Sequence, residues 1–119
     1  MSEDNILQDI KQVLGIEASD ASYDTDLLMH ISTAISVLTQ LGIGPADLLV
    51  DKDTTWENFI GSTSRYISAK SYIYLKVRIL FDPPTSGFVL DAWKSHASEL
   101  EWRLNILAES APKEVPLPW

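Results

Sequence analysis

The fold of this chain is decided by residues 64–81, which read SRYISAKSYIYLKVRILF. Placed on a helix, this segment carries one apolar stripe and a second stripe on roughly the opposite side. The first stripe contains Tyr66, Ala69, Ile73, Val77 and Leu80, and the second contains Tyr72, Leu75 and Ile79. A helix that is apolar on nearly all sides must be covered on nearly all sides. We therefore expect either the central helix of a small bundle or a helix held between its own domain and a neighbouring subunit.

A corner at Asp82-Pro83-Pro84 ends this helix, because neither proline can donate a backbone hydrogen bond and each disfavours helix in the residue before it. A second long helix is expected from about Gly87 to Glu109, with Thr85 or Ser86 as its N-cap. Its main apolar stripe consists of Val89, Trp93, Ala97, Leu100, Leu104 and Leu107. We interpret the corner as a structural hinge rather than a binding site.

The opposite face of the second long helix combines large apolar and polar side chains. Phe88, Trp102 and Ile106 fall there, beside Asp91, Ser95 and Glu99. Such apolar residues are hard to cover within one small bundle. Two interpretations stay open: contact with another subunit or partner, or coverage by the C-terminal tail or the N-terminal helices.

Two further helices are predicted in the first third of the chain. Residues 4–14 place Ile6, Leu7, Ile10, Val13 and Leu14 on one face, and Gly15 suits the position after the helix. Residues 25–41 carry a stripe of Leu27, Leu28, Ile31, Ile35, Leu38 and Leu41. Asp24 is the expected N-cap of this helix, and Gly42 ends it.

Residues 42–62 are less regular. Gly44-Pro45 can open a single helical turn through Leu49. Thr54 and Glu57 match a capping box, so a short helix is expected over residues 55–60, ending at Gly61. This helix would bury Trp56, Phe59 and Ile60. These residues either pin the segment onto the bundle or form a contact surface for a partner.

The predicted fold class is therefore all-α. It is a small bundle of four main helices plus one short helix over residues 1–111, with an extended tail over residues 112–119. The last ten residues contain three prolines and end on Trp119, so they cannot form a helix and should be polyproline-like where ordered. The tail either packs back onto its own domain or reaches a neighbour or partner.

Composition limits the class of protein. The chain has 119 residues, the length of one domain, and its hydrophobic content of 45% argues against a disordered protein. The absence of cysteine excludes disulfides, zinc–thiolate sites and a cysteine nucleophile. No secretory signal and no apolar run of the roughly 18 residues that a membrane span needs is visible. We expect a soluble protein of a reducing compartment.

The net charge of −8 is unevenly placed. Up to Glu57 there are eleven acidic residues and two basic ones, whereas from Asn58 onward there are six acidic and seven basic ones. An acidic chain without a basic patch is poorly suited to grip nucleic acid, because Lys and Arg supply most of that affinity. Either the acidic surface is simply solvated, or the unlike-charged halves meet between subunits in a head-to-tail contact.

Catalytic and metal-binding patterns are not found. His30 and His96 each lie on a predicted helix and form no His-x-x-x-His pair, so we interpret both as packing or surface residues. Asp51-x-Asp53-x-Thr55 resembles the start of a calcium loop, but Trp56 stands where such a loop needs glycine. Gly42-x-Gly44 lacks the remainder of a dinucleotide-binding fingerprint. We predict a protein that is not an enzyme and has no cofactor or metal.

The sequence on either side of the proline corner carries a family resemblance. YLKVRILFDPPTSGFVLDAW at 74–93 and ELEWRLN at 99–105 are similar to the C-terminal half of the small head–tail connector proteins of long-tailed bacteriophages, also called head-completion or adaptor proteins. Further similarity lies in Ile6-Leu-x-Asp9-x-Lys11-x-x-Leu14-Gly15-Ile16, in YDTDLL at 23–28 and in QLG at 40–42. The resemblance spans about residues 5–109.

This resemblance implies an all-helical subunit of a ring, usually twelve-fold, that sits under the portal protein. Such a ring continues the DNA channel, retains the packaged genome and presents the platform for the tail or for a stopper or terminator protein. DNA passes without specific binding, no membrane is involved, and the protein moves from the host cytoplasm to the head–tail junction of the virion. For this chain we expect subunit contacts at Phe88, Trp102, Arg103 and Ile106, and contact of the tail, including Pro116 and Trp119, with the portal or a neighbour.

Three other classes of protein are alternatives to a connector. A tail terminator or stopper is usually rich in strands, and this chain has no convincing alternating strand pattern. A DNA-packaging accessory subunit should carry a basic recognition helix, which the charge count disfavours. A small helical regulatory or antitoxin-like module that binds a protein partner is the main alternative, and it predicts a stable small dimer with no affinity for virion parts.

Overall fold

The computed structural model describes residues 5–45, 47–61 and 67–110, and it shows five helices in these ranges. They are α1 (Ile6–Leu14), α2 (Asp24–Gln40), α3 (Trp56–Ile60), α4 (Ile67–Phe81) and α5 (Gly87–Ser110). Outside the helices, these ranges contain loops and one isolated antiparallel bridge, between Asn5 and Thr55. The predicted all-α fold, with four main helices and one short one, is confirmed.

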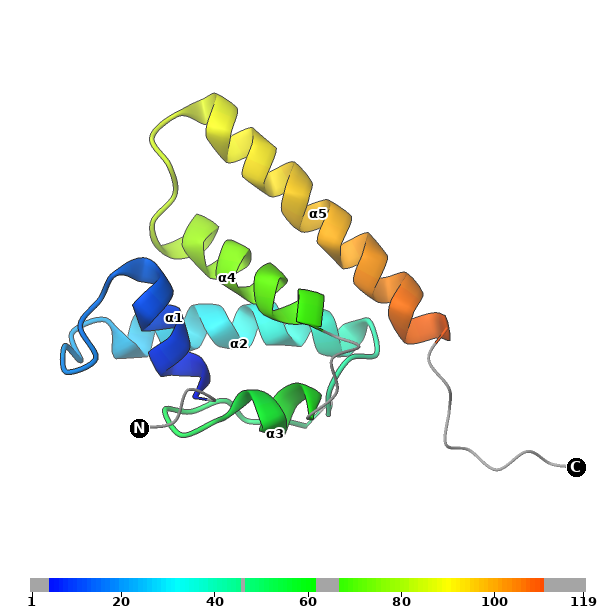
Figure 1. Ribbon diagram of the computed structural model, residues 1–119, viewed down its shortest axis with the longest axis horizontal. Coiled ribbons are helices and arrows are strands. Elements are labelled where there is room, and N and C mark those ends of the chain that lie inside the picture. Colours follow the sequence, from blue (N-terminus) through cyan, green and yellow to red (C-terminus); the bar gives the residue numbers. More distant parts are fainter. Residues whose placement is uncertain (1–4, 46, 62–66, 111–119) are drawn as a thin grey trace, which may run out of the picture.

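Helix α4 is the central helix of the bundle, as one of the two interpretations predicted. It lies between α2 and α5 and also contacts α1 (Figure 1). Ala69, Tyr72, Ile73 and Val77 are buried, and the second-stripe residues Leu75 and Ile79 pack against the core. The prediction for Leu80 was wrong: its side chain is 42% exposed, because it lies in the last turn of α4. Tyr66 and the predicted start at Ser64 lie outside the described residues.

Helix α1 begins two residues later than predicted, because Asn5 caps it by accepting a 2.9 Å hydrogen bond from the backbone N–H of Gln8. It ends as predicted at Gly15, which adopts the left-handed conformation with φ 78°. Val13 was placed on the buried face but is 45% exposed, whereas Ile6, Leu7 and Ile10 are buried.

Helix α2 also starts differently from the prediction. Asp24 is its first helical residue rather than its N-cap, and Tyr23 occupies the cap position without a side-chain hydrogen bond. The carboxylate of Asp24 instead pairs at 3.0 Å with the ammonium of Lys11 on α1. Lys11 is 1% exposed and also donates to the carbonyl of Ala18, so a buried cation joins α1, the following loop and α2. The C-cap is Leu41, one residue before Gly42.

Helix α3 confirms the predicted short helix but with a different capping box. The box is formed by Thr55 and Asn58 rather than by Thr54 and Glu57. The hydroxyl of Thr54 lies within the Asp51 turn instead, 3.2 Å from the carboxylate of Asp51. Where a single helical turn was predicted after Gly44-Pro45, the N–H of Leu48 donates to the carbonyl of Pro45 and closes one turn, which includes a residue outside the described ranges.

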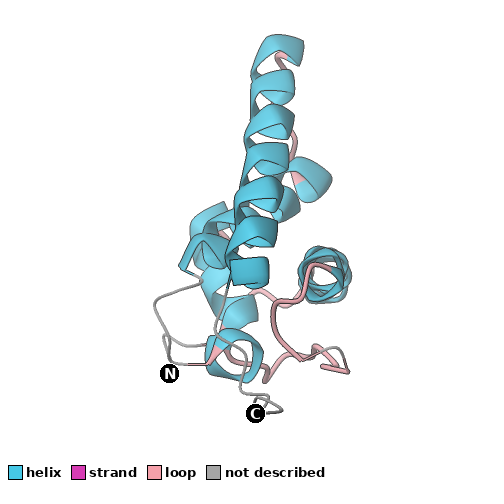
Figure 2. Ribbon diagram, turned by 90° about the vertical axis from the view of Figure 1, so that its right-hand side faces the viewer, coloured by secondary structure: helices cyan, strands magenta, loops and turns pink. Residues whose placement is uncertain are grey.

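Helix α5 begins as predicted, because Ser86 caps it. The carbonyl of Ser86 accepts a hydrogen bond from the N–H of Leu90, and its hydroxyl accepts one from the N–H of Val89. It runs antiparallel to α4, with Tyr72 opposite Glu101 and Arg78 opposite Trp93. Since α5 has 24 residues and α4 has 15, this register carries the first turn of α5 beyond the end of α4. Figures 1 and 2 show α5 along one edge of the molecule, with its first turns projecting from the bundle.

Candidate assembly surface

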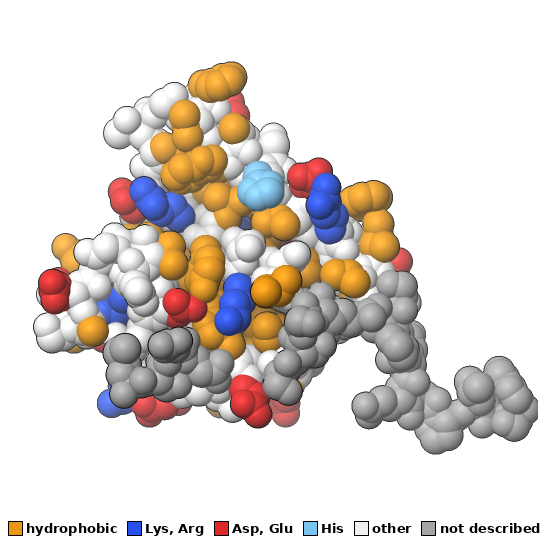
Figure 3. Space-filling view, viewed as in Figure 1, with side chains coloured by type: hydrophobic (Ala, Val, Ile, Leu, Met, Phe, Trp, Pro, Cys, Tyr) orange, Lys and Arg blue, Asp and Glu red, His pale blue; other side chains and the backbone are white. Residues whose placement is uncertain are grey.

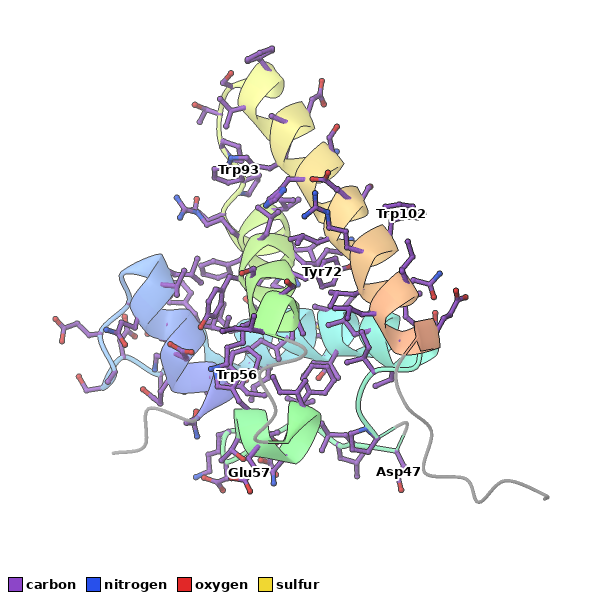
Figure 4. All side chains as sticks on the ribbon, turned by 45° about the vertical axis from the view of Figure 1, so that its right-hand side comes forward. Asp47, Trp56, Glu57, Tyr72, Trp93 and Trp102 are labelled. Atoms are coloured by element: carbon purple, nitrogen blue, oxygen red, sulfur yellow. The ribbon has the colours of Figure 1, made fainter. Side chains whose placement is uncertain are left out.

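The outer face of α5 exposes the large apolar residues that the sequence singled out. Phe88 is 85% exposed, Trp102 is 64% exposed and Ile106 is 43% exposed. Trp102 points away from the bundle in Figure 4, whereas Trp93 on the same helix points toward α4. Figure 3 shows apolar side chains at the surface in the region of α5. The N-terminal helices therefore leave the outer face of α5 exposed, whereas the C-terminal tail, the other covering element considered, lies outside the described residues.

The charged groups on this face form only exposed pairs. Arg103 pairs with Glu99 at 3.3 Å, and the ring of His96 lies 3.8 Å from the same carboxylate. The side chains of all three residues are more than half exposed. Pairs of this kind contribute little to stability, so Arg103 can exchange Glu99 for another partner at small cost.

The inner face of α5 fixes which side of the helix is turned outward. Ala97, Leu100 and Leu104 are buried in the core. The hydroxyl of Tyr72 on α4 donates a 2.7 Å hydrogen bond to the carboxylate of Glu101. Burial first, and then this hydrogen bond, raises the pKa of Tyr72 above its ordinary value. The neutral phenol is thus part of the contact that holds α5 against α4.

A cation–aromatic contact joins α4 and α5 near the proline corner. The guanidinium of Arg78 lies 5.5 Å from the centre of the Trp93 ring, and its Nε is 3.9 Å from the carboxylate of Asp82. Asp82 and Pro83 are exposed at this corner, and Pro84 is half-buried. The position of the corner between two long helices is consistent with the predicted hinge, and its role as a hinge stays a prediction.

A polar cluster that the sequence did not predict joins α1, α3 and α4. The carboxylate of Asp9 accepts hydrogen bonds from the indole N–H of Trp56 at 2.9 Å and from the hydroxyl of Tyr74 at 2.6 Å. The two rings meet edge to face, and the ammonium of Lys70 lies 5.2 Å from the centre of the Trp56 ring. Burial, followed by the bond to Asp9, raises the pKa of Tyr74 above its ordinary value.

The aromatic residues of α3 are buried against the bundle. Trp56 is 1% exposed and Phe59 is 2% exposed, so these side chains pin α3 onto the bundle and are not a surface for a partner. The tryptophan in a predicted short helix was the only sequence signal for the cluster. Asp9 and Tyr74 lie 65 residues apart, and no local pattern joins them.

The chain is similar to one known protein family over most of its length. A family model described as phage connector protein matches residues 6–111, which is nearly the whole described fold. The chain belongs to the phage connector protein family. No curated protein and no solved structure matches the chain. The family makes this connector a structural protein of the bacteriophage virion and confirms the resemblance noted in the sequence.

The residues that the sequence analysis considered as candidate metal ligands make local contacts in the connector. No group of three or more histidine, aspartate or glutamate side chains within the described residues is placed to hold a metal ion. His30 packs with its ring 6.4 Å from that of Phe81, and Asp51 accepts a bond from the N–H of Asp53 in a local turn. Among the described helices, none is both long and apolar enough to cross a membrane.

The predicted site residues of the connector thus fall into three groups. Phe88, Trp102, Arg103 and Ile106 share the exposed side of α5. Asp82, Pro83 and Pro84 form the corner at its N-terminal end. Pro116 and Trp119 lie outside the described residues. The first group is the candidate assembly surface.

Proposed function

We propose that this connector forms a ring at the head–tail junction of the virion, between the portal protein and the tail. The ring extends the DNA channel and joins the head to the tail-side stopper or terminator protein. Membership in the connector family supports the class of function, and the exposed outer face of α5 is the observation that carries the proposal for this chain. Each subunit uses Phe88, Trp102, Arg103 and Ile106 for contact with its neighbour.

The physical argument for subunit contact rests on the pattern of exposure. Aromatic residues and arginine are enriched where protein interfaces concentrate their binding energy. Here Phe88 and Trp102 project into solvent from a helix whose opposite side is anchored by buried Leu100 and Leu104. The buried side chains fix the backbone of α5 near Trp102, so contact there requires less ordering of the backbone than contact through a loop.

A ring needs a heterologous contact, in which one surface of a subunit meets a different surface of the next. The acidic N-terminal half of the chain supplies a different surface from the α4–α5 pair, in keeping with the head-to-tail alternative from the charge distribution. The corner at Asp82–Pro84 then serves as the hinge that adjusts α5 to the neighbour, and the C-terminal tail with Pro116 and Trp119 reaches the portal or the adjacent subunit. Twelve subunits would match the portal.

The test is genetic and visual. An amber codon replaces that of Trp56 in the phage that encodes this chain, and the lysate of a non-suppressing host is examined by electron microscopy. Free tails beside unjoined heads are expected, with DNA retained or leaking. A suppressor that inserts tryptophan should restore joined particles, which makes it the matched control. Intact infectious particles in the non-suppressing host would contradict the proposal and favour the regulatory module.

A further inference from the structure

The outer face of α5 has a regular pattern that extends beyond its three large apolar residues. Six positions follow one another at alternating spacings of four and three residues: Phe88, Ala92, Ser95, Glu99, Trp102 and Ile106. All six are exposed, and all lie on the side of α5 turned away from the core. A spacing of four and three over 19 residues is that of a coiled-coil seam, about 28 Å long. Apolar side chains occupy the two ends of this seam, and Ser95 and Glu99 stand at its centre.

We propose that two copies of this chain pair through this seam, with their α5 helices antiparallel about a two-fold axis. In this register Phe88 lies opposite Ile106 of the second copy. Ala92 lies opposite Trp102, and Ser95 lies opposite Glu99. Each contact occurs twice, as a two-fold interface requires. Of the antiparallel registers, this one alone places all six positions opposite one another.

Size complementarity favours the antiparallel arrangement. The largest side chain of the seam, Trp102, meets one of the smallest, Ala92, so that the indole is accommodated against the facing helix. In a parallel arrangement with equal register, each residue would meet its own copy, and the two indoles would compete for the same space. Large side chains facing small ones are the condition for close packing between helices.

Charge complementarity points the same way. Glu99 would face the identical carboxylate in a parallel pair, which is unfavourable in a partly dehydrated seam. In the antiparallel pair Glu99 faces Ser95, whose hydroxyl can donate a hydrogen bond to the carboxylate. Beside the seam, Asp91 approaches Asn105 of the other copy, again a possible acceptor and donor rather than two like charges.

The area of the seam implies a weak pair. Two phenylalanines, two tryptophans and two isoleucines with their flanking residues would bury on the order of 1,000 Å² in total, the lower end for a specific interface. The pair is therefore expected to dissociate readily. Resting on the proposed ring, its role is to cover the α5 surface until the portal presents a better partner, so that free subunits do not assemble elsewhere.

The absence of cysteine from the chain allows a direct test of the register. Two full-length proteins are made, one with Ser95→Cys and one with Glu99→Cys, and each is oxidised alone and in an equal mixture. Disulfides demand close approach of the two sulfurs, so the mixture should yield at least about fivefold more cross-linked dimer than either protein alone. Equal yields, or efficient cross-linking of Ser95→Cys alone, would overturn the antiparallel register.

A second measurement examines the association itself by sedimentation equilibrium. Trp102→Ala should weaken pairing about tenfold or more, because the variant removes the largest side chain of the seam. Leu49→Ala is the matched control, since Leu49 is 87% exposed but lies outside α5, and it should pair like the unmodified chain. Equal association of all three proteins, or a monomer of 13.3 kDa for the unmodified chain at every concentration, would overturn the pair.

The ring and the pair can fail separately. The amber phage is complemented with the dimer cross-linked between Ser95→Cys of one copy and Glu99→Cys of the other. Heads and tails should stay unjoined until a reductant is added. Joining before reduction would overturn the covering role of the pair. If particles form without the chain at all, the proposed ring function fails, whereas the cross-linking result still decides the pair.

Discussion

Tyr72 and Glu101 face each other across the α4–α5 contact, with the phenolic hydroxyl donating a 2.7 Å hydrogen bond to the carboxylate. The next residue, Trp102, is rotated by about 100° on the helix and is thereby turned out of the bundle. One partly buried contact on the inner side of α5 thus helps to determine which residues are exposed on the outer side. The stability of the bundle and the geometry of the assembly surface are therefore linked.

Tyr72→Phe is expected to lower the free energy of unfolding by about 1–2 kcal/mol, because a hydrogen bond to a charged acceptor is lost while the ring stays packed. Urea unfolding followed by circular dichroism measures the change. Glu101→Gln is the matched control, since it keeps an oxygen acceptor and should cost less. An unchanged unfolding free energy for Tyr72→Phe would show that the bond does not hold α5.

Stability is expected to fall at alkaline pH. The folded chain raises the pKa of Tyr72 and Tyr74 above 10.0, so it favours both neutral phenols. Their contribution is fully present below about pH 10 and is lost as the pH rises beyond it, because the unfolded chain then releases protons that the folded chain keeps.

The difference between two proteins isolates this effect from lysine titration. The doubly substituted variant Tyr72→Phe, Tyr74→Phe and the unmodified chain are compared by urea unfolding from neutral pH to about pH 11. The unmodified chain should lose more stability than the variant over the alkaline part of that range. Parallel curves would contradict the prediction.

Trp56 and Trp102 should respond oppositely to substitution. Trp56→Ala is expected to cost about 3–5 kcal/mol, because it empties a buried site and removes a bond to Asp9. Trp102→Ala should change stability by no more than about 0.5 kcal/mol, since its side chain is 64% exposed, and should abolish joining of heads to tails. Thermal unfolding and complementation of the amber phage measure the two effects. A large loss of stability in Trp102→Ala would place this residue in the core.

Gly44 is expected to tolerate no side chain. An added Cβ would lie 2.6 Å from the ring of Phe59 and 2.9 Å from its carbonyl oxygen. Gly44→Ala should therefore cost about 1–3 kcal/mol more than Gly15→Ala, which shares a positive φ but meets nothing within 4 Å. Urea unfolding of both variants gives the difference, and equal costs would refute the close approach.

Asp24→Asn is expected to cost about 2–3 kcal/mol, because it leaves the buried Lys11 ammonium with the Ala18 carbonyl and without its ion-pair partner. The cost stays below that of a fully buried pair, since the Asp24 side chain is 27% exposed. Adding Lys11→Met should recover part of the loss by removing the buried charge. A double variant less stable than Asp24→Asn would argue against this account.

The helices and the core were largely determined by local sequence. Apolar residues at three- and four-residue spacing predicted α1, α2, α4 and α5, and the double stripe of α4 predicted its central place. The errors occur at helix ends. Asn5, Thr55 and Tyr23 were not predicted as caps, because several polar residues in each loop can serve, and tertiary contacts choose among them. Asp24, for example, forms an ion pair with Lys11, and the hydroxyl of Thr54 bonds to the carboxylate of Asp51.

The sequence by itself determined an all-helical chain, a proline corner between two long helices and a second apolar face on the last of them. It could not determine whether that face was covered, since coverage depends on how helices from distant parts of the chain are placed. The tertiary structure decided that Phe88 and Trp102 are exposed while Trp56 is buried. It also brought Asp9 to Tyr74 across 65 residues. Hydrophobic periodicity is a property of neighbouring residues, whereas burial and polar pairing are properties of the packed chain.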